Sequence, residues 1–175
     1  RNWLPWWWLV PHTRTRLLRP VTDYTFPILA QGLADIVGEG GYGGMGAHGD
    51  QHGIGSHWEI EMLASALGPM GALEVSTLHG AHFIGAEKDL GSITVGKLAD
   101  LVILNSNPLD RIRNTVDLKY VMKSGLLYDA RTLDQLWPER KPFGEHYWLN
   151  PGATTTDNRP TDYWDRPRTL EKRSP

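Results

Sequence analysis

Three of the seven histidines, His48, His52 and His57, fall within ten residues of the chain. Asp50 lies between the first two, and Glu59 follows the third. Neutral imidazole and carboxylate are ligands that zinc and similar divalent ions accept, so this group predicts a metal site or a site of proton transfer. The spacing alone is weak evidence for metal and favours hydrogen-bonded loop histidines, because a glycine-rich loop does not hold side chains on one face as a helical H-E-x-x-H does.

The composition excludes several other classes of function. The chain has 175 residues, of which 18 are basic and 20 acidic, and its net charge of -2 gives no reason to expect nucleic acid or an anionic membrane as a partner. It has no cysteine, so disulfides and thiolate metal sites are excluded and His, Asp and Glu remain as the strong protein ligands. No apolar run approaches the roughly 18 residues of a membrane span.

The candidate residues must be positioned by the elements on either side of them. Apolar residues three or four apart predict a helix over residues 26–37, capped by Thr22 or Asp23 and stopped by Gly38. Residues 38–55 are rich in glycine, which predicts the end of a strand that opens into a tightly folded loop.

Two helices are predicted after this loop. Ser56 is expected to cap the first of them, with Glu59 three residues later completing a capping box. Gly68 ends this helix, and a second helix is expected over residues 69–84. The predicted buried face of the first helix consists of Trp58, Met62 and Leu63.

Residues 90–107, LGSITVGKLADLVILNSN, predict two short strands joined by a turn. Ile93 and Val95 belong to the first strand and residues 101–104 to the second, which the pair Asn107-Pro108 brings to an end.

The chain after this strand predicts one more pair of strands. A helical turn is expected over residues 108–115, followed by a hairpin of residues 118–123 and 126–129 across Ser124-Gly125. From Thr132 onward the sequence is polar and proline-rich, which indicates a tail rather than further elements.

The pattern GxxxxGKxADLVxL in residues 91–104, with PMGALEVSTLHGAHFIG before it, resembles the end of a metal-dependent amidohydrolase of the imidazolonepropionase-like type. The resemblance implies an α/β fold, with the C-terminal part of a (β/α)8 barrel and strands of the small β-sandwich that accompanies it. It also implies that the chain is the C-terminal part of something larger, because such a barrel needs about 250 residues.

The resemblance divides the chain into four parts. Residues 1–20 form an approach segment rich in tryptophan and arginine, and residues 21–88 form the end of the barrel. Residues 89–130 supply sandwich strands, and residues 131–175 form an extended polar tail. In this arrangement Lys97 and Asp100 are interpreted as residues that hold the sandwich together, and His79 and His82 as packing or surface histidines.

The resemblance also assigns roles within the histidine group. His48 stands where the family places an aspartate, at the end of strand 8, that touches the metal and takes a proton from the attacking water. The predicted catalytic residues are therefore His48 and Asp50, with His48 as the metal ligand and zinc as the expected metal. His52, His57 and Glu59 are candidates for substrate or loop contacts. The family's remaining ligands have no counterpart in the chain and are expected before Arg1.

The predicted function is that of part of a hydrolase in which metal-activated water attacks an amide, cyclic amide or ester. The alternative is a non-catalytic structural or assembly module derived from an amidohydrolase C-terminus. The expected partners are the missing barrel portion or other copies of the chain, together with a small-molecule or peptide-like substrate. The 175 residues alone are expected to be inactive, to bind metal weakly and not to be soluble monomers. Localisation is open, although the resemblance to exported proteins favours a periplasmic or secreted one.

Overall fold

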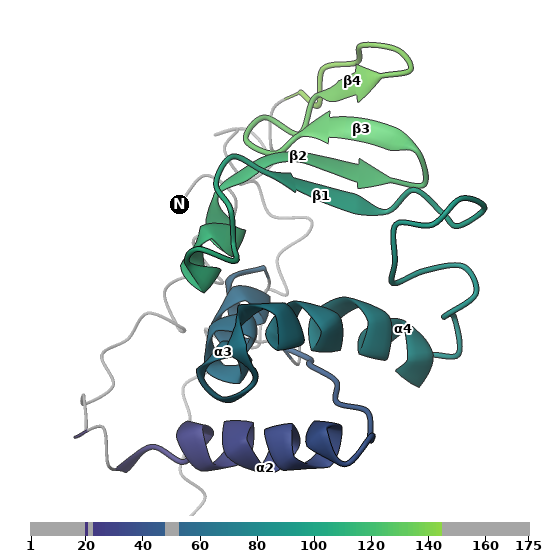
Figure 1. Cartoon of the computed structure of the whole chain (residues 1–175). Coiled ribbons are helices and arrows are strands. Elements are labelled where there is room, and N and C mark those ends of the chain that lie inside the picture. The colour runs from purple at the N-terminus through teal and green to yellow at the C-terminus, as the bar shows by residue number, and fades with distance from the viewer. Residues whose placement is uncertain (1–19, 21–22, 48–52, 145–175) are drawn as a thin grey trace, which may run out of the picture. The chain divides into compact units, whose positions relative to one another are not determined.

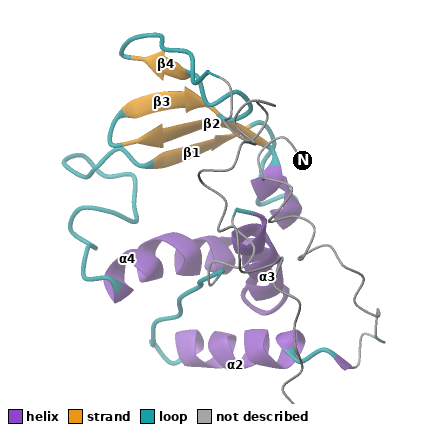
Figure 2. Cartoon of the chain, turned by 180° about the vertical axis from the view of Figure 1, so that it is seen from behind, coloured by secondary structure: helices purple, strands orange, loops and turns teal. Residues whose placement is uncertain are grey.

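The computed structural model describes residues 20, 23–47 and 53–144. The chain divides into two compact units, one of Arg1–Leu17 with Gly144–Pro175 and one of Leu18–Phe143. The second unit combines helices with an antiparallel sheet (Figures 1 and 2). This combination agrees with the predicted α/β class. No helix in the described part of the chain has the length and apolar character needed to cross a membrane.

Helix α2 spans Phe26–Gly38, as the sequence predicted. The predicted cap at Thr22 or Asp23 is wrong, because Thr25 is the N-cap and no side chain caps the helix. Pro27 lies in the first turn, where its missing N–H needs no partner within the helix, and this position sets the start of the helix after Asp23.

Helix α3 spans Ile54–Glu74 and bends at Gly68, whose φ of 71° and ψ of 170° are not helical. Pro69 then begins the second part, so the predicted break between two helices is confirmed. The predicted cap at Ser56 is wrong: Gly53 is the N-cap, and no side chain caps this end. The chain continues without a break into η2, a π-helical turn at Val75–His79, and α4 at Gly80–Phe83.

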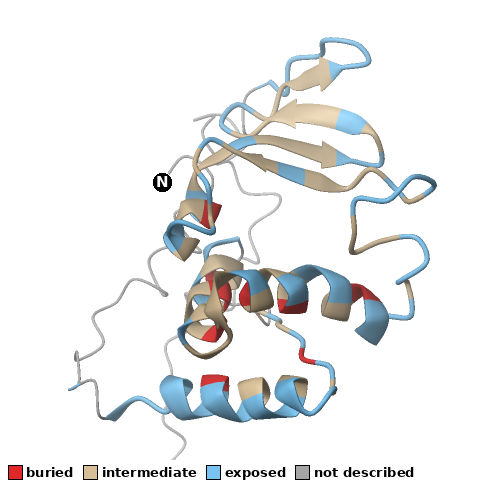
Figure 3. Ribbon diagram, viewed as in Figure 1, coloured by how far each residue is buried: buried red, intermediate tan, exposed pale blue. Residues whose placement is uncertain are grey.

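The buried core lies between these helices (Figure 3). Leu63 is 2% exposed, as predicted, but Trp58 is exposed and Ile60 takes its place on the buried face. Apolar residues that α2, the following glycine-rich segment and η3 (Ile112–Val116) contribute pack against this core; they include Leu33, Val37, Met45 and Ile112.

The sheet has four antiparallel strands in the order β1-β2-β3-β4. Their bounds are Leu101–Leu104 for β1, Leu118–Lys123 for β2, Leu126–Asp129 for β3 and Gln135–Trp137 for β4. The predicted hairpin is confirmed, and both of its turn residues, Ser124 and Gly125, have positive φ. Such turns match the twist of the flanking strands, which explains the glycine. The sequence analysis did not predict β4, which pairs with β3 within the polar stretch.

Two predicted strands are absent from the described residues. Residues 93–95 form no strand, and Ile93 and Val95 are 89% and 103% exposed. Residues 41–47 likewise have no regular structure. A strand requires a neighbour that accepts and donates its backbone hydrogen bonds, and no described segment pairs with either stretch.

Lys97 and Asp100, within the GKLAD sequence, make polar contacts that hold the chain before β1. Lys97 Nζ donates to the carbonyls of Glu87 at 2.5 Å and Leu90 at 2.8 Å. Asp100 accepts hydrogen bonds from Lys123 Nζ and, at 2.6 Å, from the Ser124 N–H. The bond from Lys123 and that from Ser124 hold the pKa of Asp100 below its usual value. Both residues therefore have the structural contacts that the sequence analysis expected of them.

Candidate functional site

Three members of the predicted site, His48, Asp50 and His52, lie outside the described residues. The other two, His57 and Glu59, lie near the start of α3. The described segment that leads toward His48 is residues 41–47, called the glycine segment below. The described part of the site therefore comprises the glycine segment, the first turns of α3 and the residues that contact them.

The glycine segment passes so close to its neighbours that side chains would not fit at several positions. A Cβ added to Gly41 would lie 2.6 Å from Ile36 Cγ2, and one added to Gly43 would lie 2.9 Å from Leu33 Cδ1. A Cβ on Gly44 would approach the Phe83 ring to 3.1 Å. These contacts favour glycine at positions 41, 43 and 44, where a Cβ would force a neighbour to shift, whereas a Cβ on Gly46 would meet nothing within 4 Å.

Two side chains from the helices accept hydrogen bonds from this backbone. Glu59 Oε2 accepts from the Gly46 N–H at 2.7 Å, and His79 Nδ1 accepts from the Gly43 N–H at 3.2 Å. Glu59 thus contacts a loop, as the sequence analysis allowed, rather than completing a capping box. The glycine segment is held at two points, one from each side of the break in α3.

The ring of Tyr42 packs between two histidines of the following helices. It stacks on His82 with a centroid separation of 3.9 Å and meets His79 edge to face at 5.1 Å. The interpretation of His79 and His82 as packing histidines agrees with these contacts, but His79 has the additional polar role described above.

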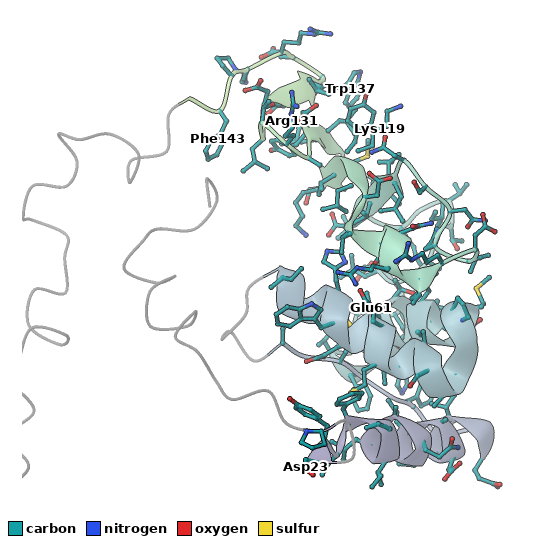
Figure 4. All side chains as sticks on the ribbon, turned by 90° about the vertical axis from the view of Figure 1, so that its left-hand side faces the viewer. Asp23, Glu61, Lys119, Arg131, Trp137 and Phe143 are labelled. Carbon is teal, nitrogen blue, oxygen red and sulfur yellow. The ribbon has the colours of Figure 1, made fainter. Side chains whose placement is uncertain are left out.

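His57 connects α3 to η3. Its Nδ1 lies 3.1 Å from Oγ1 of the buried Thr115, and burial lowers the pKa of His57, partly offset by the charge of Glu61. Glu61 lies on α3 (Figure 4), with its Oε1 4.0 Å from Arg113 Nε. The contacts of His57 are therefore with protein groups of the fold, and a contact with substrate stays a prediction.

The described residues do not make a metal site by themselves. Within residues 20, 23–47 and 53–144 no three His, Asp or Glu side chains are grouped so that they could hold an ion. His48 therefore remains a sequence-based candidate for a ligand.

The roles of Glu59 in binding Gly46 and of His79 in binding Gly43 were not predicted. The paired residues are 13 and 36 positions apart in the sequence. No local pattern marks such pairs, because the helices must pack before the acceptors reach the glycine segment.

Comparison with known proteins finds similarity over part of the chain. The model of the Amidohydrolase family matches residues 58–127. The 5'-deoxyadenosine deaminase of Methanobrevibacter smithii is 37% identical over 59 residues, covering 34% of this chain and 13% of the relative. The imidazolonepropionase of Shouchella clausii is 38% identical over 71 residues, covering 38% of this chain and 15% of the relative. The chain thus spans only a small fraction of either relative.

The chain is also similar to solved structures. A prolidase complexed with N-methylphosphonate-L-proline is 31% identical, with a TM-score of 0.51 over 57% of this chain and 26% of that one. An Xaa-Pro dipeptidase with bound methionine is 24% identical, with a TM-score of 0.53 over 71% of this chain and 32% of that one. At this identity the similarity concerns the fold and not the function. The resemblance found in the sequence is thereby confirmed.

Proposed function

We propose that this chain, whose residues 58–127 belong to the amidohydrolase family, is the C-terminal portion of a metal-dependent hydrolase that cleaves C–N bonds in amides or cyclic amides, or the C–O bond of esters. The similar proteins include a deaminase, an imidazolonepropionase and a prolidase. A deaminase breaks a C–N bond by name, which supports this class of reaction.

The fold that we propose for the whole domain is a (β/α)8 barrel with an accompanying β-sandwich. Helices α2 to α4 would belong to the end of the barrel and the four strands to the sandwich. The observation that carries this proposal is the exposure of Ile93 and Val95, at 89% and 103%, within the family's signature sequence. Ile93 and Val95 are β-branched, apolar and two positions apart, so they would lie on one face of a strand. Their exposure fits a strand whose neighbours come from another part of the protein.

The described residues would contribute positioning to the proposed reaction. Glu59 and His79 fix the backbone of the glycine segment, which precedes His48 and Asp50 in the sequence. When bound, a divalent metal supplies a water of lowered pKa and polarises the carbonyl under attack. No group of three His, Asp or Glu side chains that could hold this metal is found in residues 20, 23–47 and 53–144. The roles of His48 and Asp50 therefore rest on the family resemblance.

The second candidate is a non-catalytic assembly module. It is favoured by the apolar side chains that α2 exposes, among them Ile28 at 74% and Leu29 at 62%. Such residues normally pack against another surface. A missing barrel portion and a partner protein would cover them equally well, so a different observation must separate the two functions.

The gene sequence upstream of Arg1 provides that observation. The enzyme requires an H-x-H on a predicted strand roughly 250 to 350 residues before His48, given the usual size of a barrel. An open reading frame that begins near Arg1 would instead support the assembly module.

Activity measurements test the enzyme directly. The purified full-length protein is assayed with dipeptides, cyclic amides and esters, alongside His48→Ala and Asp50→Asn. Loss of a group that handles the proton lowers kcat by about 10² to 10⁴-fold. The control is Asp110→Asn, which makes the same chemical change at an exposed position of the described part. Equal activity in all four proteins would refute the assigned roles of His48 and Asp50.

A further inference from the structure

We infer that His79 and Glu59 are positioning residues that latch the glycine segment, and that the latch at His79 opens when the imidazole binds a second proton. The inference concerns residues 41–47, 59 and 79, all of which the structure describes. Only its consequence for hydrolysis rests on the proposed function.

The two hydrogen bonds differ in what they require of the acceptor. Glu59 Oε2, 2.7 Å from the Gly46 nitrogen, accepts as a carboxylate. His79 Nδ1, 3.2 Å from the Gly43 nitrogen, accepts only while it carries no proton, since imidazolium has a donor at both ring nitrogens. Gly43 is buried, so losing this acceptor leaves its N–H without the partner that the fold supplies.

The helix that carries His79 has a special geometry at this point. His79 is the last residue of the π-helical turn Val75–His79, and such turns inside α-helices occur frequently at functional sites. Two hydroxyls of this turn bond to carbonyls in the last turn of α3: Ser76 Oγ donates to Ala72 O at 2.5 Å, and Thr77 Oγ1 donates to Leu73 O at 2.7 Å. The turn thus has its own supporting contacts, and it places Nδ1 of His79 at the glycine segment.

The surroundings of His79 are compatible with a proton-controlled contact. Two titratable side chains lie near this contact. Tyr42 meets the His79 ring edge to face, and His82 stacks on the Tyr42 ring. No carboxylate is recorded as a hydrogen-bond or ion-pair partner of His79 among the described residues. A second proton on Nδ1 of His79 removes the acceptor for the Gly43 N–H.

The latch acts on the chain immediately before the proposed catalytic residues. Gly43 is five positions before His48 in the sequence, and when the contact to His79 is lost, the bond from Gly46 to Glu59 remains as the other polar contact that holds the glycine segment. In the proposed hydrolase, an open latch would reduce kcat because a catalytic group is effective only when its backbone is fixed.

Hydrogen exchange of the Gly43 and Gly46 amides, measured on the purified protein at pH 8 and pH 5 and corrected for intrinsic exchange rates, tests the latch. Losing one hydrogen bond should reduce the protection of the Gly43 amide about fivefold to tenfold at pH 5. In His79→Asn the amide oxygen is bonded to Cγ, as Nδ1 is in histidine. This oxygen accepts a hydrogen bond at pH 8 and at pH 5, so protection of the Gly43 amide should stay high at both. In His79→Phe, which keeps a ring against Tyr42, protection should be low at both.

Two controls separate the latch from general effects of acid. His82→Asn should leave the pH dependence at Gly43 unchanged, and Glu59→Leu should lower protection at Gly46 at both pH values. Equal protection of Gly43 at pH 8 and pH 5 in the unmodified protein would overturn the inference, as would His79→Asn behaving like His79→Phe.

The assay of hydrolysis is read separately. If the protein is a hydrolase, His79→Asn should flatten the fall of kcat at acidic pH that the unmodified protein shows. A pH-independent kcat in the unmodified protein, with the exchange result as expected, would overturn the catalytic consequence and leave the latch standing. Absence of any hydrolysis would refute the proposed function alone, because the exchange measurement does not depend on activity.

Discussion

Replacing Gly91 with alanine should destabilise the protein far more than the same change at Gly96. Both residues have positive φ, 87° and 96°, so alanine is strained at either position. The surroundings differ: a Cβ on Gly91 would lie 2.7 Å from Ala81 Cβ and 3.0 Å from the Thr77 carbonyl oxygen, whereas nothing lies within 4 Å of one on Gly96.

The magnitude follows from three contributions. The left-handed conformation costs alanine about 1–2 kcal/mol, and the less flexible unfolded chain returns about 0.4–1 kcal/mol. We therefore expect Gly96→Ala to lower the free energy of unfolding by about 0–1.6 kcal/mol. Overpacking costs a further ~1–3 kcal/mol at Gly91, which gives about 1–4.6 kcal/mol for Gly91→Ala.

Urea denaturation of the three proteins, followed by circular dichroism, measures this difference. The two variants share the strain and the effect on the unfolded chain, so their difference isolates the close contact of Gly91 with the π-helical turn. Equal losses in the two variants would refute the packing of residue 91 against η2, and a loss of less than about 1 kcal/mol at Gly91 would refute the strain argument as well.

Three further results are expected. Leu63→Ala, which removes a side chain that is 2% exposed, should cost about 2–5 kcal/mol of unfolding free energy in urea, whereas Met70→Ala, at 54% exposure, should stay within about 0.5 kcal/mol. Asp100→Asn should lower the melting temperature at pH 7, and this difference from the unmodified protein should shrink in acid. The reason is that a carboxylate whose pKa is depressed in the fold contributes stability above its unfolded pKa, and this stability is lost as the pH falls through the folded pKa. A difference in melting temperature that is constant down to pH 2 would contradict this. Because the pKa of His57 is lowered in the fold, stability should fall as the pH drops below the ordinary histidine value of 6.5. His57→Asn, which does not titrate, should reduce that fall in the urea midpoint between pH 8 and pH 5.5. An identical fall in both proteins would show that His57 does not cause it.

The sequence by itself determined those features whose cause is local. The helix over residues 26–38, the break at Gly68-Pro69 and the hairpin across Ser124-Gly125 follow from periodicity, from the missing N–H of proline and from the positive φ that a tight hairpin requires. The signature sequence also predicted the similarity to the Amidohydrolase family, whose model matches residues 58–127.

Only the tertiary structure decided which side chains serve the candidate site and which predicted strands form. Glu59 has the spacing of a capping residue, yet its carboxylate bonds to Gly46 because packing brings the glycine segment within reach. His79 acquires its polar role through the π-helical turn, which periodicity does not reveal. Ile93 and Val95 have the composition of a strand but form none, because a strand exists only where another segment supplies the other half of its hydrogen bonds.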